Sequence, residues 1–287
     1  MTSPSIDTCI ARGANFLKKA EIDSPRREAR LLLAHATKQS FEWIVAHSEA
    51  DCSVGDIYDA LIDRRCAHEP FSHIVGTREF WSLPFRVSAD VLDPRSDSET
   101  LVSAALACFP VRERPLRVLD LGTGSGCLLL SFLHERPWAL GIGVDCSTAA
   151  LLVARENARD LGLAERARFL CADWAQCLSG RFDLILANPP YIPTADIAGL
   201  LPEVSSYEPR RALDGGAEGL DCYRAIVAQL PAVSGGETRV VLEFGINQAP
   251  AVSEIFQACG FAQIEVIPDL AGLPRCLVAS GLTSTVA

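Results

Sequence analysis

The sequence has 287 residues, of which 49% are hydrophobic and 22% are charged, and its formal net charge at pH 7 is −10. This balance is typical of a globular protein large enough for one large domain and a smaller one. No uncharged apolar run approaches the ~18 residues that cross a bilayer, and charged residues interrupt the first 30 positions. We therefore expect a cytoplasmic protein without a membrane span or signal peptide. An acidic chain offers no cationic face to nucleic acid, so we expect no stable nucleic-acid partner.

The 11 cysteines are scattered along the chain. No two of them form a Cys-x-x-Cys pair, and Cys171 and Cys177 have no histidine nearby, so the sequence predicts no metal site. We interpret most of them, including Cys127, Cys146 and Cys171, as small apolar residues in buried segments. A catalytic thiol is the weaker interpretation.

The sequence pattern of residues 1–70 predicts a small helical domain. Apolar residues at helical spacing run from Ile6 to Ala20, and Ser24-Pro25 has the pattern of an N-cap followed by proline at the first helical position. A further helix is expected between Ser53 and Pro70. Helices this short cannot bury their apolar faces alone, so we expect them to pack together.

Residues 71–94 are rich in β-forming residues and are broken by Gly76 and Pro84. Extended segments are predicted at 71–75, 79–81 and 84–87. The sequence therefore predicts a β-hairpin connector between the helical domain and the rest of the chain.

Residues 95–287 are predicted to form an α/β domain, because strand and helix patterns alternate. Such alternation is typical of a mainly parallel sheet with helices on both faces. The last two strands lie close together in sequence, as in an antiparallel hairpin. We predict strands at 117–121, 139–144, 167–171, 182–187, 238–244, 261–267 and 275–279.

A glycine-rich turn follows the first of these strands. It consists of Gly122, Thr123, Gly124, Ser125 and Gly126. Glycine allows positive φ angles and close approach of the backbone to a ligand. Three alternating glycines therefore favour a ligand site over a plain strand–helix turn.

The composition of the turn narrows the choice of ligand. A dinucleotide fingerprint would need glycine at position 127, which is Cys127, and a P-loop would need a lysine that is missing. Asp120, just before the turn, would repel pyrophosphate but would suit a ligand with an ammonium and a sulfonium group. S-adenosylmethionine carries both groups.

Two further strand ends carry polar residues that suit a nucleoside. Asp145 ends the second strand, where a carboxylate can accept both ribose hydroxyls; the alternative is an acid that stabilises the N-terminus of the next helix. Asp173 and Trp174 follow the third strand. Asp173 can accept from an adenine amino group while Trp174 covers the ring.

The fourth strand ends in Asn188-Pro-Pro-Tyr191. A carboxamide nitrogen is a poor nucleophile, and a site can improve it by accepting hydrogen bonds from both of its N–H groups. The Asn188 side-chain oxygen and the Pro189 carbonyl are two such acceptors. Proline rigidity holds the second acceptor in place, and Tyr191 can pack on the flat amide.

The chain resembles the HemK-type peptide chain release factor glutamine methyltransferases over nearly its whole length. The resemblance rests on several blocks besides the glycine turn and the segment 188–193. They are Ala29 to His35, Ile74 to Phe85, Tyr207 to Arg210, Ala212 to Gly216 and Asp269 to Gly272. It implies a seven-stranded Rossmann-like class I S-adenosylmethionine-dependent methyltransferase domain at 95–287, with 1–70 as a substrate-docking domain.

The resemblance also implies roles for particular residues. The substrate site is expected at Asn188, Pro189, Pro190 and Tyr191. The cofactor site is expected at Asp120, Gly122, Thr123, Gly124, Ser125, Gly126, Asp145, Asp173, Trp174 and Asn188. The implied reaction transfers a methyl group from S-adenosyl-L-methionine to the amide nitrogen of the glutamine in the Gly-Gly-Gln motif of class-one release factors.

One segment departs from the pattern of the family. The chain reads Pro94-Arg-Ser-Asp-Ser-Glu99 where the family usually reads Pro-Arg-Pro-Glu-Thr-Glu, and the effect of Ser96 is open. A Pro-Arg-Ser start also resembles the enzymes that methylate a glutamine of a ribosomal protein, which is the first alternative. An adenine-N6 nucleic-acid methyltransferase is a second, and a non-catalytic module that binds the cofactor structurally is a third.

Overall fold

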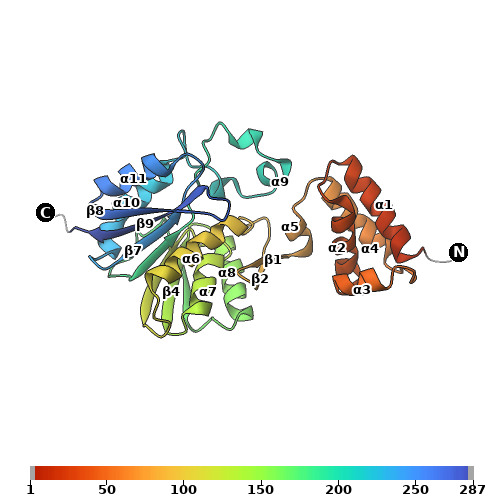
Figure 1. Ribbon diagram of the computed structural model, residues 1–287, viewed down its shortest axis with the longest axis horizontal. Coiled ribbons are helices and arrows are strands. Elements are labelled where there is room, and N and C mark those ends of the chain that lie inside the picture. The colour runs from red at the N-terminus through yellow and green to blue at the C-terminus, as the bar shows by residue number, and fades with distance from the viewer. Residues whose placement is uncertain (1–3, 284–287) are drawn as a thin grey trace. The chain divides into compact units, whose positions relative to one another are not determined.

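The computed structural model describes residues 4–283. The chain forms two compact units (Figure 1). The helical unit comprises the chain up to Gly76 together with Leu201–Tyr207, and the sheet unit comprises Thr77–Leu200 and the chain from Glu208 onward. The predicted divisions after residues 70 and 94 differ from this grouping, and the return of 201–207 to the helical unit was not predicted.

The helical unit is built from short helices around a common apolar core. They are α1 (Ile6–Lys19), α2 (Pro25–Thr37), α3 (Phe41–Ala46), α4 (Gly55–Cys66) and α5 (Phe71–Val75). The short helix α9 (Pro202–Ser205) also belongs to this unit but has no buried residue. The predicted apolar face of α1 is buried from Ile6 to Leu17. Gly13 is required at the contact with α4, because a Cβ there would lie 2.2 Å from the Tyr58 hydroxyl oxygen. That hydroxyl donates to the Ala29 carbonyl at 3.2 Å.

The segment 71–75 is helical, so the predicted extended structure there was wrong. Pro70 precedes the helix and Gly76 ends it with φ of 76°, a left-handed conformation that glycine adopts without steric cost. Burial of Ser72 and Ile74 against the helical unit outweighs the β-propensity of five residues, which is a weak local preference.

The predicted hairpin follows this helix. Strands β1 (Thr77–Phe80) and β2 (Leu83–Arg86) pair antiparallel. Phe80 and Phe85 pack edge to face with ring centroids 6.1 Å apart and belong to the core of the sheet unit. The hairpin is therefore part of the sheet unit in the structure.

Within the described residues, the sheet unit contains a seven-stranded sheet in the order β5-β4-β3-β6-β7-β9-β8. All seven predicted strands are confirmed. They are β3 (Leu116–Leu121), β4 (Ala139–Asp145), β5 (Ala167–Cys171), β6 (Leu184–Ala187), β7 (Arg239–Glu243), β8 (Phe261–Pro268) and β9 (Pro274–Leu282). The first five run parallel, and β9 pairs antiparallel with both β7 and β8.

Helices cover both faces of this sheet, as predicted (Figure 1). Alternate residues of each strand enter opposite cores: Val118 faces one cluster and Leu119 the other, as the two-residue period of a strand requires. One face carries α6 (Glu99–Cys108), α7 (Cys127–Glu135) and α8 (Thr148–Asp160), and the other carries α10 (Asp221–Val233) and α11 (Ala249–Ala258). Short 3₁₀ turns are η1 (Ser96–Ser98), η2 (Ile197–Gly199) and η3 (Arg210–Ala212). None of the helices in 4–283 is long and apolar enough to span a membrane.

Candidate active site

A pocket lies in the sheet unit at the C-terminal ends of β3, β4, β5 and β6. The strand order reverses between β3 and β6, and such a switch point opens a crevice in parallel α/β sheets. The free space is about 1050 Å³, including its open mouth. Among the predicted site residues, those that line it are Gly122, Thr123, Gly124, Ser125, Asp145, Asp173, Trp174, Asn188 and Pro190. Four others, Asp120, Gly126, Pro189 and Tyr191, are not in its lining.

The glycine turn is held from behind by the neighbouring strand. The amides of Gly122 and Thr123 both donate to the Val144 carbonyl at 2.9 Å. The three glycines have φ of 74°, 54° and 82°, which side chains rarely adopt. A Cβ at Gly124 would meet no heavy atom within 4 Å, so the space in front of this backbone is free for a ligand.

Asp120 lies beneath the turn and is only 1% exposed. Its Oδ2 accepts from the Thr123 hydroxyl at 2.6 Å, while its Oδ1 has no hydrogen-bond partner among the described residues. Burial raises the pKa of Asp120 to about 7, the Thr123 hydrogen bond opposes the rise, and the charge of Asp145 adds to it. Asp120 thus supports the turn and places an unpaired oxygen behind it.

Asp145 lines the pocket at the end of β4. One carboxylate oxygen accepts from the Gly124 amide at 2.9 Å and the other from the Ser147 amide at 2.8 Å. Ser147 is the N-cap of α8, so this carboxylate also serves the helix start. Each ionised carboxylate oxygen can accept more than one hydrogen bond, which leaves capacity on both oxygens for a ligand.

Trp174 covers the glycine turn from the side of β5. Its backbone is left-handed, with φ of 50°, and a Cβ built on Gly122 would lie 3.4 Å from the indole ring. Asp173 is exposed and also lines the pocket. Together they form a flat apolar wall with an acceptor beside it.

Asn188 is anchored by its amide nitrogen. Nδ2 donates to the Ser98 hydroxyl oxygen at 3.2 Å and to Glu243 Oε2 at 3.1 Å. Among the described residues, neither Asn188 Oδ1 nor the Pro189 carbonyl accepts a hydrogen bond. Two acceptors are therefore available, one from the side chain and one from the next residue's backbone.

Tyr191 is held behind the pocket rather than in its lining. Its hydroxyl donates to Glu243 Oε1 at 3.2 Å. Burial raises the pKa of the Tyr191 phenol, and the charge of Glu243 adds to this. Glycine backbones crowd the turn: a Cβ at Gly215 would lie 2.8 Å from the Pro190 carbonyl oxygen, and one at Gly219 would lie 2.3 Å from the Tyr191 carbonyl oxygen. The anchored Tyr191 side chain and the close glycine backbones together fix the course of the chain after Asn188.

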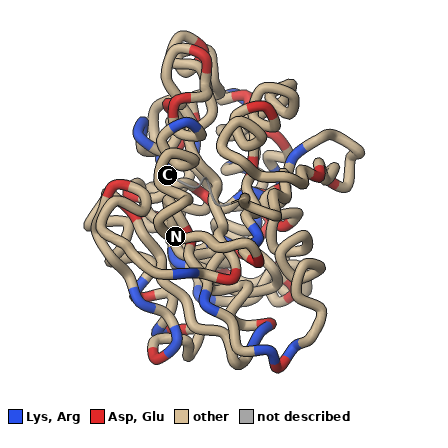
Figure 2. Tube along the Cα trace, turned by 90° about the vertical axis from the view of Figure 1, so that its left-hand side faces the viewer, with Lys and Arg blue, Asp and Glu red and all other residues tan. Residues whose placement is uncertain are grey.

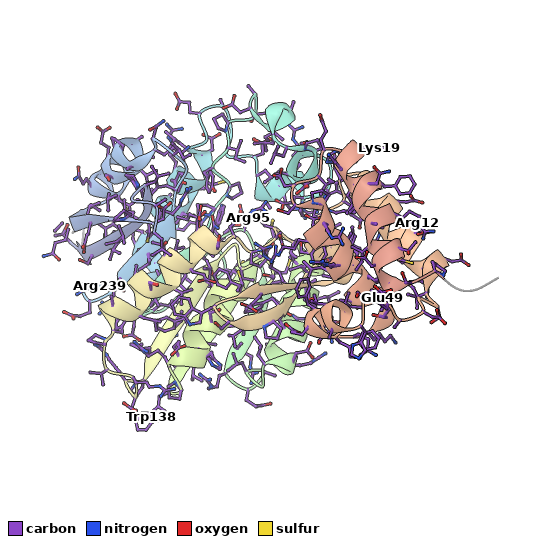
Figure 3. All side chains as sticks on the ribbon, turned by 45° about the vertical axis from the view of Figure 1, so that its right-hand side comes forward. Arg12, Lys19, Glu49, Arg95, Trp138 and Arg239 are labelled. Carbon is purple, nitrogen blue, oxygen red and sulfur yellow. The ribbon has the colours of Figure 1, made fainter. Side chains whose placement is uncertain are left out.

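The segment before α6 carries residues that sequence reasoning did not assign. Arg95, labelled in Figure 3, pairs with Glu208 at 2.5 Å, and Asp97 lies 3.3 Å from Arg275. Ser98 donates to Glu243 at 2.5 Å. Glu243 itself was also missed, although an acid that ends a buried apolar strand is the same signal that marked Asp145.

Comparison with known proteins identifies the class of protein to which this chain belongs. A family model described as the PrmC N-terminal domain matches residues 8–76, and one described as the methyltransferase small domain matches 79–200. The catalytic domain of hMettl16 has a TM-score of 0.59 and 12% identity, covering 78% of this chain and 83% of that one; at this identity it shares the fold alone. The ribosomal protein L11 methylase of Lactobacillus delbrueckii subsp. bulgaricus has a TM-score of 0.50 and 20% identity, covering 67% and 83%. The fold and pocket are those of a class I methyltransferase, an enzyme whose methyl donor is S-adenosylmethionine.

Curated relatives give the family. A release factor glutamine methyltransferase of Rhodospirillum rubrum is 47% identical over 277 residues, which cover 94% of this chain and 83% of that protein. One of Cereibacter sphaeroides is 44% identical over 265 residues, covering 92% and 94%. The chain belongs to the family of release factor glutamine methyltransferases.

The residues of the pocket fit S-adenosylmethionine. The open space at Gly124 accepts a ligand close to the backbone, and Asp145 retains acceptor capacity for hydroxyl groups. The unpaired oxygen of Asp120 places partial negative charge behind the turn, which favours a cationic ligand.

Replacing Asp145 with alanine should weaken S-adenosylmethionine binding by about 1–3 kcal/mol, because buried ligand hydroxyls would lose their acceptor. Titration calorimetry should show the dissociation constant rising about 5- to 150-fold. Asp160→Ala removes an exposed carboxylate at the end of α8 that pairs with Arg86 of β2 and should leave affinity unchanged. Unchanged affinity in a folded Asp145→Ala protein would contradict the assignment.

Cofactor affinity should rise with pH through the titration of Asp120. A cationic ligand favours the ionised carboxylate, so binding below the free-enzyme pKa of about 7 must release a proton. Between about pH 6 and about pH 8 the affinity should gain up to about tenfold, and it should level off above about pH 8. Titration calorimetry of Asp120→Asn should show a flatter profile; the same slope in that variant would assign the titration to another group.

Proposed function

We propose that this enzyme methylates the side-chain amide nitrogen of the glutamine in the Gly-Gly-Gln motif of class-one peptide chain release factors. The curated relatives named for this activity cover nearly the whole chain. The observation that carries the proposal is the pair of available acceptors, Asn188 Oδ1 and the Pro189 carbonyl, beside the cofactor pocket. An amide NH₂ group offers two donors that match them.

The chemistry requires an oriented amide nitrogen. Its lone pair is delocalised into the carbonyl, and two hydrogen bonds from its N–H groups to Asn188 and Pro189 favour pyramidal geometry at nitrogen. When bound beside Asn188, the cofactor would supply an electrophilic methyl group for this oriented nitrogen. Methyl transfer would form the C–N bond as the C–S bond breaks, and the proton would leave the nitrogen for water afterwards, so no strong base would be required.

The residues proposed to bind the cofactor lie at or just after the C-terminal ends of three strands, β3, β4 and β5. Asp145 would accept from the ribose hydroxyls, Trp174 would cover the adenine and Asp173 would accept from its amino group. Gly122 to Gly126 let the backbone approach the ligand, and Asp120 acts from below through its charge rather than by lining the pocket.

A protein substrate is favoured over a nucleic acid. The net charge is −10, and blue and red segments are mixed over the side of the trace in Figure 2. Duplex DNA binding needs a cationic face to displace counterions. Because release factors act in translation, we place the enzyme in the cytoplasm.

The helical unit is proposed to dock the body of the release factor. The Gly-Gly-Gln loop is small and offers little interface of its own, whereas a stable complex buries about 800 Å² on each partner. The unit also holds part of the chain that follows the substrate site. Arg65 binds both Glu28 and Glu203 at 2.6 Å, and the Tyr207 hydroxyl donates to the Ala67 carbonyl at 2.7 Å.

Incubation of intact release factor with labelled cofactor should add one methyl group to its motif glutamine, as read by mass spectrometry of the digested factor. Asn188→Ala should lower the single-turnover rate at least about tenfold with a smaller effect on factor binding, since its hydrogen bond matters most as nitrogen pyramidalises. A factor with Gln→Ala in the motif is the control. Labelling of a ribosomal protein or of adenine in DNA, with the factor unlabelled, would support one of the alternatives instead.

Intact release factor should be a better substrate than a free peptide with the same loop, by at least about tenfold in kcat/KM, because the peptide lacks docking contacts. Removing residues 1–70 should erase this advantage and spare cofactor binding, since the pocket lies in the sheet unit. The truncation leaves Glu203 and Tyr207 without Arg65 and Ala67, so replacement of 201–207 by a glycine-serine linker in full-length enzyme is the matched control. A truncated enzyme that methylates intact factor as well as full-length enzyme does would refute docking by this unit.

A further inference from the structure

Glu243 is a buried carboxylate that the proposed reaction does not use as an acid or base. It ends β7, is 2% exposed and is not part of the pocket lining. Burying a charge is costly unless donors compensate it. A carboxylate in this position therefore requires a reason beyond the packing of the strand.

Three side chains donate hydrogen bonds to this carboxylate. The Ser98 hydroxyl donates to Oε2 at 2.5 Å, Asn188 Nδ2 donates to the same oxygen at 3.1 Å, and the Tyr191 hydroxyl donates to Oε1 at 3.2 Å. Burial raises the pKa of Glu243, while the Ser98 bond, the charge of Arg275 and the Tyr191 bond oppose the rise. The donors come from two separate parts of the chain, the segment before α6 and the tetrapeptide 188–191, and meet at one group.

Glu243 Oε2 accepts a hydrogen bond from Asn188 Nδ2, and this decides which end of the Asn188 amide faces the carboxylate. Nδ2 must point to Glu243, and the Ser98 oxygen, whose proton goes to Glu243, accepts from the same nitrogen. Oδ1 is then left free. The reverse orientation would set Oδ1 against the carboxylate and present N–H donors to the substrate's own N–H groups.

We propose that Glu243 is a positioning residue for methyl transfer: it holds the Asn188 amide with Oδ1 available to the substrate amide. Ser98 and Tyr191 steady the carboxylate, and Asn188 carries its effect to the reacting nitrogen. This inference rests on the proposed function, because it concerns the acceptor of a substrate N–H group.

Glu243→Gln tests the role with little change of shape. A glutamine keeps only one of the two oxygens, so its NH₂ group removes either the acceptor of Tyr191 or the acceptor that Ser98 and Asn188 share. We expect the single-turnover rate on intact release factor at saturating cofactor to fall at least about tenfold, with the dissociation constant for S-adenosylmethionine within about threefold of wild type. Glu237→Gln makes the same chemical change at an exposed residue before the other end of β7 and should leave both values unchanged.

A double-mutant cycle separates positioning from general structural support. If Glu243 acts through Asn188, then in the Asn188→Ala background the Glu243→Gln change should lower the rate by less than about threefold. An equal loss in both backgrounds, or a rate within about threefold of wild type for Glu243→Gln alone, would overturn the proposal.

If Glu243→Gln does not fold, two variants of Ser98 test the proposal instead. Ser98→Thr keeps the hydroxyl and should keep the rate, whereas Ser98→Ala should lower it by about three- to tenfold without weakening cofactor binding. Equal rates for the two variants would overturn the proposal. Failure of wild-type enzyme to methylate the factor would instead refute the proposed function, so the two failures are distinguishable.

Discussion

Parallel strands end at the same edge of a sheet, and the site depends on this constraint. Asp145, Asn188 and Glu243 lie at or just beyond the ends of β4, β6 and β7, and the glycine turn leaves β3 between two of these strands. The register brings Leu121 beside both Val144 and Ala187. Polar side chains that are far apart in the sequence therefore meet without any loop having to reach across the sheet.

Two buried acids beneath this edge are satisfied in different ways. Asp120 has a single side-chain donor, Thr123, and an oxygen without a partner, so its proton affinity is open to the charge of whatever occupies the pocket. Glu243 is surrounded by donors from Ser98, Asn188 and Tyr191. The protonation of Asp120 therefore responds to the charge of a ligand. The hydrogen bonds around Glu243 instead keep Ser98, Asn188 and Tyr191 in one orientation.

Much of the fold could be predicted from the sequence because its signals are local. Buried parallel strands are continuous apolar runs, and the alternating glycines mark the turn after β3. The helix at 71–75 was missed because tertiary burial decided a segment whose own propensity pointed the other way. Ser98 was missed because its partners Asn188 and Glu243 lie 90 and 145 positions away, whereas Glu243 was missed although it ends a buried apolar strand as Asp145 does. Hydrogen bonds of such separation leave no periodicity to detect.

The residues that approach the substrate site are also more predictable than those behind it. Asn188 and the prolines form an unusual tetrapeptide, whereas the support comes from common residues in ordinary positions. Asp120 was expected to face the ligand, and the structure places it beneath the turn, outside the pocket lining. An acid at the end of a strand can face either side of the turn that follows it. Only the packing around Thr123 shows that Asp120 lies beneath the turn.

The return of Leu201–Tyr207 to the helical unit makes that unit discontinuous in sequence. Arg65 and Ala67 bind residues encoded more than a hundred positions later. An exchange of the N-terminal unit between relatives would therefore separate these partners unless the later segment travelled with it. Recombination at a single junction near residue 76 would produce chimeras with a mismatched helical unit, so variation in partner choice is expected to arise from paired changes in two distant parts of the gene.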